Sequence, residues 1–300
     1  MNKKQIIKEL KSIELNDIIE DFQKLRDIGK KPKINTQDLN SKVGVDIVDY
    51  FTFEERLHTI GNHHINFFQF LEELSEWKKK PYVQNMVRFY QNDPQKRNTP
   101  PIKMWYRIFS LYFGSINIFK PLTAMNVYKL FGATSILDPT MGWGGRLIGA
   151  CALDIPHYIG IDMNVALKEP YKKLKSFLSQ RSSTQATLLF KNALKVNYSL
   201  YEYDLVLTSP PYYNIEKYNN TQVWETKEEW NEQFYIPLFT KTMNGLKKGG
   251  WYCINIPIEI YENICVPLWG TSDKKIPLNI SSRLKDGTYK EYIYCFRKGW

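Results

Sequence analysis

The chain has 300 residues, of which 43% are hydrophobic, 24% charged and 15% aromatic, so its composition supports a folded core and excludes a wholly disordered protein. This length accommodates one large α/β domain, or a catalytic domain with a smaller appendage. The formal net charge of +10 favours a polyanionic partner such as a nucleic acid.

Two further classes are excluded by short-range patterns. No apolar run is long enough for a membrane span, and the charged start MNKKQIIKELKSIE lacks the apolar segment of a signal peptide, so we expect a soluble, unsecreted protein of the cytoplasm or nucleus. The cysteines show no CxxC spacing, and the histidines have no HExxH or CxxC partner. We therefore expect reduced thiols and no metal site.

The first part of the chain is expected to be mainly helical. Apolar residues recur at helical spacing over 1–28, and the Phe- and Leu-rich segment 46–76 favours buried helices. Proline, asparagine and charge accumulate over 91–101, which indicates an exposed loop. We predict a helical N-terminal region over 1–100, with a possible role in nucleic-acid recognition, and a catalytic domain over 101–300.

The excess positive charge is concentrated in residues 77–130, which carry ten basic side chains and one acidic side chain. Cations can neutralise phosphates while aromatic rings stack on bases, so this mixture is typical of a nucleic-acid surface. The alternative is that the aromatic residues form a core and the cations a solvated face. The interleaved residues are Lys78, Lys79, Lys80, Arg88, Lys96, Arg97, Lys103 and Arg107 with Trp77, Tyr82, Phe89, Tyr90, Trp105 and Tyr106.

After residue 130 short apolar runs alternate with helical segments. This alternation predicts an α/β domain with a mostly parallel sheet and helices on both faces. Ligands of such sheets lie at the carboxyl ends of the strands. The predicted strands are 135–138, 158–162, 187–190, 205–208 and 251–256, and the predicted helices are 146–153, 166–179 and 227–246.

A glycine-rich segment, DPTMGWGGR at 138–146, follows the first predicted strand and opens a helix. Gly142, Gly144 and Gly145 allow the backbone to turn sharply and to approach a ligand closely. Neither GxxxxGK[ST] nor GxGxxG fits the segment, so a site for nucleotide phosphates is not favoured. A purely structural turn is the alternative for this motif.

Polar side chains follow the next two predicted strands. Asp162 ends the second strand, and its carboxylate can accept both hydroxyls of a ribose. Asn192 follows the third strand, and its amide can address an adenine edge. Together with the glycine turn, these residues predict a pocket for an adenosine-bearing cofactor.

The segment TSPPYYN at 208–214 follows the fourth predicted strand. Pro210 and Pro211 fix φ and remove two amide donors, so the carbonyls around them are expected to face a cavity as acceptors. The Ser209 hydroxyl and a carbonyl can then hold an exocyclic amino group, while Tyr212 offers a flat face to its base. This is the local chemistry of amino-group methylation, and a simple turn is the alternative.

With these two motifs the chain resembles the S-adenosylmethionine-dependent DNA amino-methyltransferases, the N4-cytosine and N6-adenine class. The resemblance covers 117–257 and does not extend to the first hundred residues. The cofactor loop of that family, DPFxGxG, corresponds to DPTMGWG with Thr140 replacing the usual aromatic residue, and its (D/N/S)PP(Y/F/W) motif corresponds to SPPY. A family segment that helps to cover the methionine end of the cofactor is similar to Lys120-Pro121.

The resemblance implies a Rossmann-like class I methyltransferase sheet, S-adenosylmethionine as the cofactor and DNA as the partner. A flipped cytosine or adenine would be methylated on its amino group. The implied catalytic residues are Ser209, Pro210, Pro211 and Tyr212. The implied cofactor-binding residues are Lys120, Pro121, Asp138, Thr140, Gly142, Gly144, Asp162 and Asn192.

The chain departs from this family in its target-recognition region. No inserted domain separates Gly145 from Ser209, and the chain is short after the last predicted strand. We therefore expect the basic N-terminal part, or the loop 214–225, to read the DNA sequence. The two motifs are also similar to those of modification methylases encoded by large DNA viruses and phages, enzymes of DNA modification as in restriction–modification systems.

Three other functions are compatible with the same motifs. An RNA amino-methyltransferase would use the same site, a catalytically idle subunit would only bind nucleic acid, and a small-molecule methyltransferase would not need the basic stretch. Methylation at C5 of cytosine is disfavoured, because that chemistry needs a cysteine nucleophile and the residue after Pro211 is Tyr212.

Overall fold

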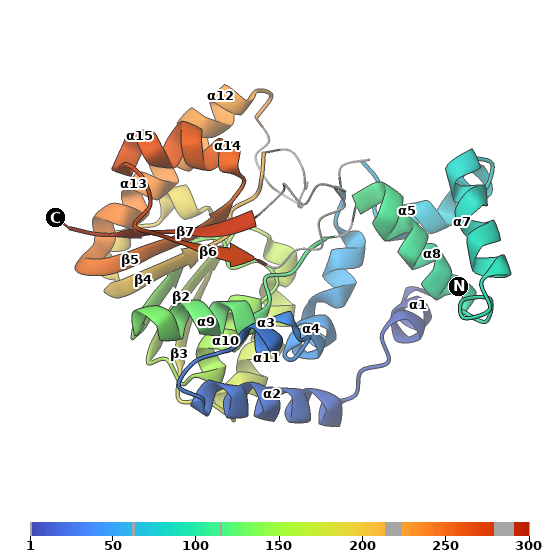
Figure 1. Ribbon diagram of the computed structural model, residues 1–300, viewed down its shortest axis with the longest axis horizontal. Helices are drawn as coiled ribbons and strands as arrows, with labels where there is room; N and C mark the ends of the chain where they lie inside the picture. Colours follow the sequence, from blue (N-terminus) through green and yellow to red (C-terminus); the bar gives the residue numbers. More distant parts are fainter. Residues whose placement is uncertain (1, 62–63, 115, 214–223, 279–290, 300) are drawn as a thin grey trace.

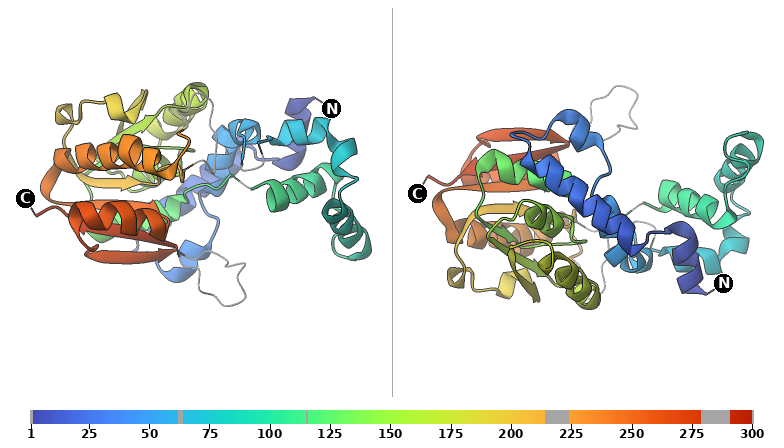
Figure 2. Two further views of the ribbon diagram at one scale, coloured as in Figure 1. Left: turned by 90° about the horizontal axis from the view of Figure 1, so that it is seen from above. Right: turned by 90° about the horizontal axis from the view of Figure 1, so that it is seen from below.

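The structure is a computed structural model of the chain, and it describes all residues except 1, 62–63, 115, 214–223, 279–290 and 300 (Figure 1). Its described part contains a seven-stranded sheet with helices on both faces. A group of helices projects to the right of the sheet in Figure 1 and stays apart from it in both views of Figure 2.

The sheet is mostly parallel, with the strand order β3-β2-β1-β4-β5-β7-β6. The first five strands pair in parallel, whereas β7 pairs antiparallel with both β5 and β6. The predicted α/β fold, a Rossmann-like and mostly parallel sheet with helices on both faces, is confirmed. The strands are β1 (Ser135–Asp138), β2 (His157–Asp162), β3 (Gln185–Phe190), β4 (Tyr203–Thr208), β5 (Leu246–Ile256), β6 (Lys274–Leu278) and β7 (Glu291–Arg297).

All five predicted strands are present, but the prediction lacks β6 and β7. The edge strand β6 contains Lys274, Lys275 and Pro277, which are typical of a protected sheet edge and carry no alternating apolar pattern. The sequence of β7, EYIYCFR, does carry a strand signal in its aromatic and β-branched residues.

Successive residues of the inner strands contribute to opposite faces of the sheet. Ile136 and Leu205 belong to the core on one face, and Leu137 and Val206 belong to the core on the other. Burial on both faces explains why these strands are apolar runs in the sequence. The helices of this sheet domain are α9 (Pro121–Phe131), α10 (Gly145–Ala152), α11 (Lys168–Ser179), α12 (Lys227–Trp230), α13 (Ile236–Gly245), α14 (Ile258–Ile260) and α15 (Val266–Trp269).

Two π-helical turns interrupt the helices that cover the second face of the sheet, the face to which Leu137 and Val206 contribute. The predicted helix 227–246 is present as α12 and α13, joined by the π turn η5 (Asn231–Tyr235). The π turn η6 (Tyr261–Cys265) joins α14 to α15 in the same way. Short 3-10 segments complete the domain: η2 (Val165–Leu167), η3 (Ala193–Lys195) and η4 (Tyr198–Leu200).

The predicted helix over 1–28 is in fact two helices, α1 (Lys3–Leu10) and α2 (Leu15–Lys30). They are separated where Glu14 caps α2, with its backbone amide donating to the Asp17 carboxylate at 2.8 Å. The apolar periodicity continues across the break because both helices bury a face. The two faces pack against different cores, however, since α1 joins a separate helical cluster and α2 joins the sheet domain.

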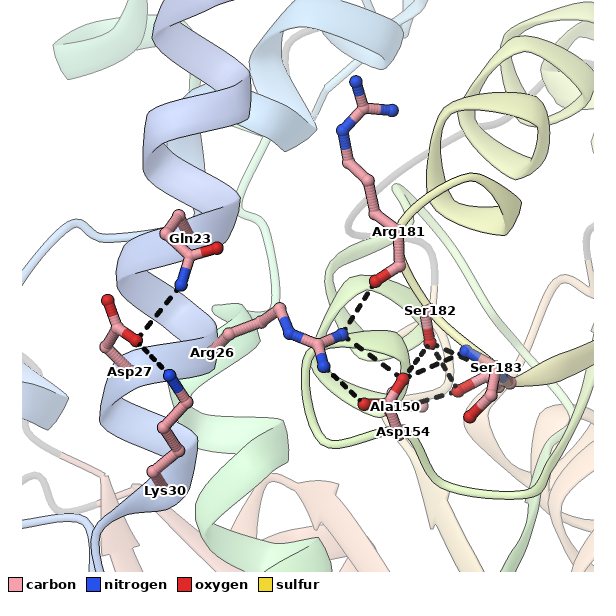
Figure 3. Close-up of polar contacts among 10 residues, drawn as sticks. Gln23, Arg26, Asp27, Lys30, Ala150, Asp154, Arg181, Ser182 and Ser183 are labelled. Carbon is pink, nitrogen blue, oxygen red and sulfur yellow. Dashed lines mark hydrogen bonds and ion pairs between the residues drawn. The ribbon is translucent and has the colours of Figure 1, made fainter.

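A polar contact holds α2 on the sheet domain (Figure 3). The Arg26 guanidinium pairs with the Asp154 carboxylate at 2.7 Å and donates to the Arg181 carbonyl at 2.7 Å. Viewed from below in Figure 2, α2 crosses the helical layer of the sheet domain. This helix near the N-terminus is therefore structurally part of the sheet domain.

We call α1, α5, α6, α7, α8 and the π turn η1 the helical arm. The arm has its own apolar core, and α4 connects it to the sheet domain by packing one half against each core. The predicted boundary at residue 100 does not follow this division, because α2 packs on the sheet domain and α8 on the arm. Among helices of the described residues, none has the length and apolar character needed to span a membrane. The bounds are α3 (Thr36–Asn40), α4 (Val45–His58), α5 (Phe67–Glu72), α6 (Leu74–Trp77), α7 (Pro81–Asn92), α8 (Pro101–Phe109) and η1 (Ser110–Gly114).

Candidate active site

A cavity of about 790 Å³ lies where the strands β1, β2, β3 and β4 end. The strand order reverses between β1 and β4, and this is the position at which sheets of this kind bind ligands. The glycine loop after β1 and the SPPY motif after β4 therefore face one cavity. Of the predicted site residues, those lining it are Lys120, Thr140, Gly142, Asp162, Asn192, Ser209, Pro210, Pro211 and Tyr212.

Three residues predicted to bind the cofactor are not in the cavity wall: Pro121, Asp138 and Gly144. Asp138 is fully buried, and its carboxylate accepts hydrogen bonds from Arg146 Nε and the Tyr158 hydroxyl, both at 2.6 Å. Burial alone disfavours a charged guanidinium, but the Asp138 carboxylate raises the pKa of Arg146. The prediction of direct ligand contact is corrected here, because Asp138 serves as the counter-ion that holds α10 against β1.

The Lys-Pro segment packs directly on the glycine loop. A Cβ atom built on Gly145 would lie 1.8 Å from the Phe119 carbonyl oxygen, so only glycine allows this approach. The Arg146 guanidinium lies 5.0 Å from the centroid of the Phe119 ring. These contacts place Lys120, between Phe119 and Pro121, on the cavity wall.

Asp162 and Asn192 both accept hydrogen bonds from backbone amides, and Asp162 thereby also binds the glycine loop. The Asp162 carboxylate accepts hydrogen bonds from the backbone amides of Gly142 and Asn164, each at 2.9 Å. Burial raises the pKa of Asp162 to about 6, although these two hydrogen bonds act in the opposite direction. The Asn192 Oδ1 accepts from the Leu194 amide at 2.9 Å, so its Nδ2 group is the part that can donate to a ligand.

Thr140 connects the two motifs. Its hydroxyl oxygen lies 2.7 Å from the Thr208 hydroxyl and donates to the Ser209 carbonyl at 3.2 Å. The residue that departs from the family pattern therefore ties the glycine loop to the end of β4.

Tyr235 holds the turn that follows the two prolines. Its hydroxyl donates to the Pro211 carbonyl at 2.6 Å and accepts from the Tyr213 amide at 2.9 Å. Tyr213 has a φ of 51°, a left-handed conformation that costs a non-glycine residue about 1–2 kcal/mol. The carbonyl oxygens of Ser209 and Pro211 thus already accept hydrogen bonds from Thr140 and Tyr235. This corrects the expectation that both face the cavity as free acceptors. No donor from the described residues reaches the Pro210 carbonyl.

Two residues that no sequence motif identifies complete this part of the cavity: Asn255 in β5 and Glu291 in β7. Asn255 Nδ2 donates to Glu291 Oε1 at 2.7 Å and to the Tyr292 carbonyl at 3.2 Å. Asn255 Oδ1 accepts from Ser209 Oγ at 3.3 Å and from the Tyr212 hydroxyl at 3.0 Å. A polar amide within the apolar run WYCINI is a signal that could have identified Asn255.

Elements far apart in the sequence contribute to the other walls. The arm contributes Leu111 of η1, the second face of the sheet contributes Phe234 of η5, and the sheet edge contributes Ile276 of β6. Of the predicted recognition loop 214–225, the segment 214–223 lies outside the described residues, and Trp224 lines the cavity.

Within the basic stretch, the interleaved basic and aromatic residues over 77–107 extend from the end of α6 through α7 and into α8. Most of its basic side chains are exposed, including Lys103 and Arg107. Of the six aromatic residues interleaved with these cations, Tyr82 and Phe89 are exposed, at 36% and 47%. The stacking surface predicted for the others is wrong, because they are needed for packing within the arm. These buried or half-buried residues are Trp77, Tyr90, Trp105 and Tyr106.

No family model matches the sequence, and no curated protein matches it. The fold is similar to TrmN from Thermus thermophilus, with 14% identity and a TM-score of 0.41 over 59% of this chain and 48% of that chain. An rRNA methylase from Streptococcus thermophilus has 12% identity and a TM-score of 0.40 over 62% and 100%. A methyltransferase homolog from Pyrococcus horikoshii has 15% identity and a TM-score of 0.42 over 73% and 83%. The chain therefore spans about half the length of TrmN, and these likenesses concern the fold alone.

Proposed function

We propose that the protein is an S-adenosylmethionine-dependent DNA methyltransferase acting on the exocyclic amino group of cytosine (N4) or adenine (N6). The base would be flipped out of its stack to reach the cavity. The observation that carries this proposal is the meeting of the glycine loop and the SPPY motif in one cavity, joined through Thr140. The cofactor pocket is therefore next to residues 209–212, which would bind the amine and which we call the lip.

The donor and acceptor groups of the cavity fit S-adenosylmethionine. The Asp162 carboxylate can accept the ribose hydroxyls, the Asn192 amide can donate to the adenine ring, and the Lys120 ammonium can pair with the methionine carboxylate. The volume of about 790 Å³ is in the range of small-molecule sites. When bound, this cofactor supplies a methyl group activated by its sulfonium, so no strong base is required.

The protein residues contribute mainly by positioning the amine. The Ser209 hydroxyl and the Pro210 carbonyl offer two acceptors for its two N–H groups, which leaves the nitrogen lone pair directed elsewhere. Tyr212 and Trp224 supply aromatic surfaces in the cavity wall for the ring of the base. Pro211 and Tyr235 keep this lip rigid through the bond between the Tyr235 hydroxyl and the Pro211 carbonyl.

We assign the DNA backbone to the exposed face of α8. This helix buries Trp105 and Ile108 in the arm and exposes Lys103 and Arg107, which are four residues apart and therefore on one face. Directly after α8, Leu111 lines the cavity. The ion pairs among described residues include neither cation, so both are available to neutralise phosphates beside the flipped base.

The test is transfer of labelled methyl groups to duplex DNA, single-stranded DNA and RNA, followed by nucleoside chromatography. The expected product is N4-methylcytosine or N6-methyladenine in DNA. The Ser209→Ala variant should lose about 10- to 100-fold in kcat, because one hydrogen bond to the amine is lost, while cofactor affinity stays close to that of the wild type. The exposed Ser75→Ala variant is the matched control.

Each contrary outcome has a distinct meaning. Label found only in RNA would replace DNA by RNA as the substrate, since both nucleic acids present the same amines. Cofactor binding without transfer to any nucleic acid would favour a non-catalytic subunit. Failure to bind S-adenosylmethionine would contradict the proposed function altogether.

A further inference from the structure

We propose that Asn255 and Glu291 act as positioning residues that hold the Ser209 hydroxyl as a hydrogen-bond acceptor toward the substrate. The pair would thereby select a group that brings its own N–H donors. This inference rests on the proposed function and assigns its amine specificity to two residues outside both recognised motifs. It follows from a chain of hydrogen bonds that begins at the Asn255 amide, whose orientation its partners determine.

The orientation of the Asn255 amide is determined by its partners. Asn255 is 5% exposed, and its Nδ2 lies 2.7 Å from the Glu291 carboxylate and 3.2 Å from the Tyr292 carbonyl. Both partners can only accept hydrogen bonds. A flipped amide would place its oxygen against two acceptors, so Nδ2 faces Glu291 and Oδ1 faces Ser209 and Tyr212.

The amide orientation makes Asn255 Oδ1 an acceptor for two neighbouring hydroxyl groups. Asn255 Oδ1 can only accept, and it lies 3.0 Å from the Tyr212 hydroxyl and 3.3 Å from Ser209 Oγ. The Tyr212 hydroxyl also lies 3.2 Å from the Asn255 carbonyl, 3.4 Å from Glu291 Oε1 and 3.2 Å from Ser209 Oγ. The Ser209 proton therefore has an acceptor inside this network, and at least one Ser209 lone pair remains for the cavity.

The result is a lip that offers two acceptors. One is Ser209 Oγ, and the other is the Pro210 carbonyl, which no described residue uses. An amino group satisfies both acceptors with its two N–H bonds, whereas a carbonyl oxygen on a base would face them without a proton. Such a mismatch in a buried site lowers binding by about tenfold or more. The lip therefore discriminates cytosine and adenine from bases with a carbonyl at the same position.

Three variants test this assignment. Asn255→Leu removes the acceptor at similar volume, and we expect kcat to fall by about 10- to 100-fold with little change in cofactor affinity. Asn255→Asp keeps the acceptor but places two carboxylates together, so one must bind a proton to restore the bond. Its activity should therefore return at mildly acidic pH and decline as pH rises.

The third variant, Asn255→Asp with Glu291→Gln, reverses donor and acceptor. The introduced amide can donate to the introduced carboxylate, so activity should recover across the whole pH range. The exposed Asn244→Asp variant controls for an added carboxylate and should behave as the wild type. Cofactor affinity and unfolding free energy are measured for every variant beside turnover.

The proposal is overturned if Asn255→Leu retains wild-type turnover. It is also overturned if the double variant folds and binds cofactor yet is no more active than Asn255→Leu. The pair is tested without any substrate as well. The unfolding free energy of Asn255→Asp, relative to the wild type, must fall as pH rises, because a carboxyl with a raised folded-state pKa stabilises only while protonated. A wild type that transfers no methyl group would contradict the proposed function, whereas a missing pH dependence would contradict this inference.

Discussion

The hydroxyl oxygens of Thr140 and Thr208 lie 2.7 Å apart, and this interaction joins the loop after β1 to the loop after β4. Thr140 donates its proton to the Ser209 carbonyl at 3.2 Å, so Thr208 donates to Thr140. The two motifs of the candidate site are thus linked through a pair of side chains, one of which, Thr208, is fully buried.

We expect the Thr140→Val variant to lose this link at nearly constant volume. The buried Thr208 hydroxyl would lack its acceptor, which costs about 1–3 kcal/mol of unfolding free energy. Turnover should fall further than cofactor affinity, because the amine lip would no longer be held against the glycine loop. Chemical denaturation and methyl-transfer kinetics measure the two effects. The exposed Thr271→Val variant is the control, and equal loss in both variants would contradict the role of Thr140.

The Gly145→Ala variant should destabilise the protein and weaken cofactor binding together. The new Cβ would meet the Phe119 carbonyl at 1.8 Å, and that oxygen belongs to the backbone, so the Lys-Pro segment has to move away. Overpacking of this kind costs about 1–3 kcal/mol or more. Gly299→Ala is the matched control, since a Cβ there meets nothing within 4 Å. Thermal unfolding and cofactor titration check the result, and wild-type values for Gly145→Ala would exclude the close approach.

Cofactor affinity should depend on the ionisation of Asp162. Burial raises the pKa of Asp162 from its ordinary value of 3.8 to about 6. The ionised carboxylate is the better acceptor for ribose hydroxyls, so we expect the Kd for the cofactor to increase as pH is lowered through about 6. Asp162→Asn should bind more weakly at neutral pH and show a flatter pH dependence. A wild-type Kd that is constant across this range would remove Asp162 from cofactor binding.

Lowering the pH should affect protein stability through Asp162 in the opposite direction to cofactor binding. A carboxyl with a raised folded-state pKa is held more tightly protonated in the folded than in the unfolded protein. The wild type should therefore gain unfolding free energy, relative to Asp162→Asn, as pH falls from about 6 toward 3.8. Denaturation of both proteins at several pH values checks this, and a constant difference would show that the carboxyl is not desolvated.

Neutralising the exposed face of α8 should weaken DNA binding in a salt-dependent manner. For Lys103→Ala with Arg107→Ala we expect lower affinity for DNA and a salt dependence reduced by about one unit of slope for each phosphate that is no longer neutralised. Fluorescence anisotropy at several salt concentrations measures both quantities. Lys172→Ala with Lys175→Ala removes two exposed charges from α11 as the control. Equal effects of the two pairs would show only a general response to net charge.

The N-terminal helices show which features of the fold the sequence can predict. The periodicity of 1–28 correctly predicted helix, yet it could not reveal that α1 and α2 pack on different cores. An apolar stripe indicates that one face of a helix is buried, but it does not indicate which core that face packs against. For the same reason the aromatic residues of 77–130 suggested a stacking surface, whereas most of them fill the core of the arm.

The alternating sheet, the two motifs and the polar residues at the strand ends could be predicted from the amino-acid order, because each depends on neighbouring residues and on backbone chemistry. The burial of Asp138 as a counter-ion, and the meeting of Asn255 and Glu291 with Ser209 and Tyr212, depend on the three-dimensional fold. The antiparallel pairing of β5 with β7 brings residues 36 positions apart within 2.7 Å. Proximity of this kind arises from how strands pair, and no local pattern encodes that pairing.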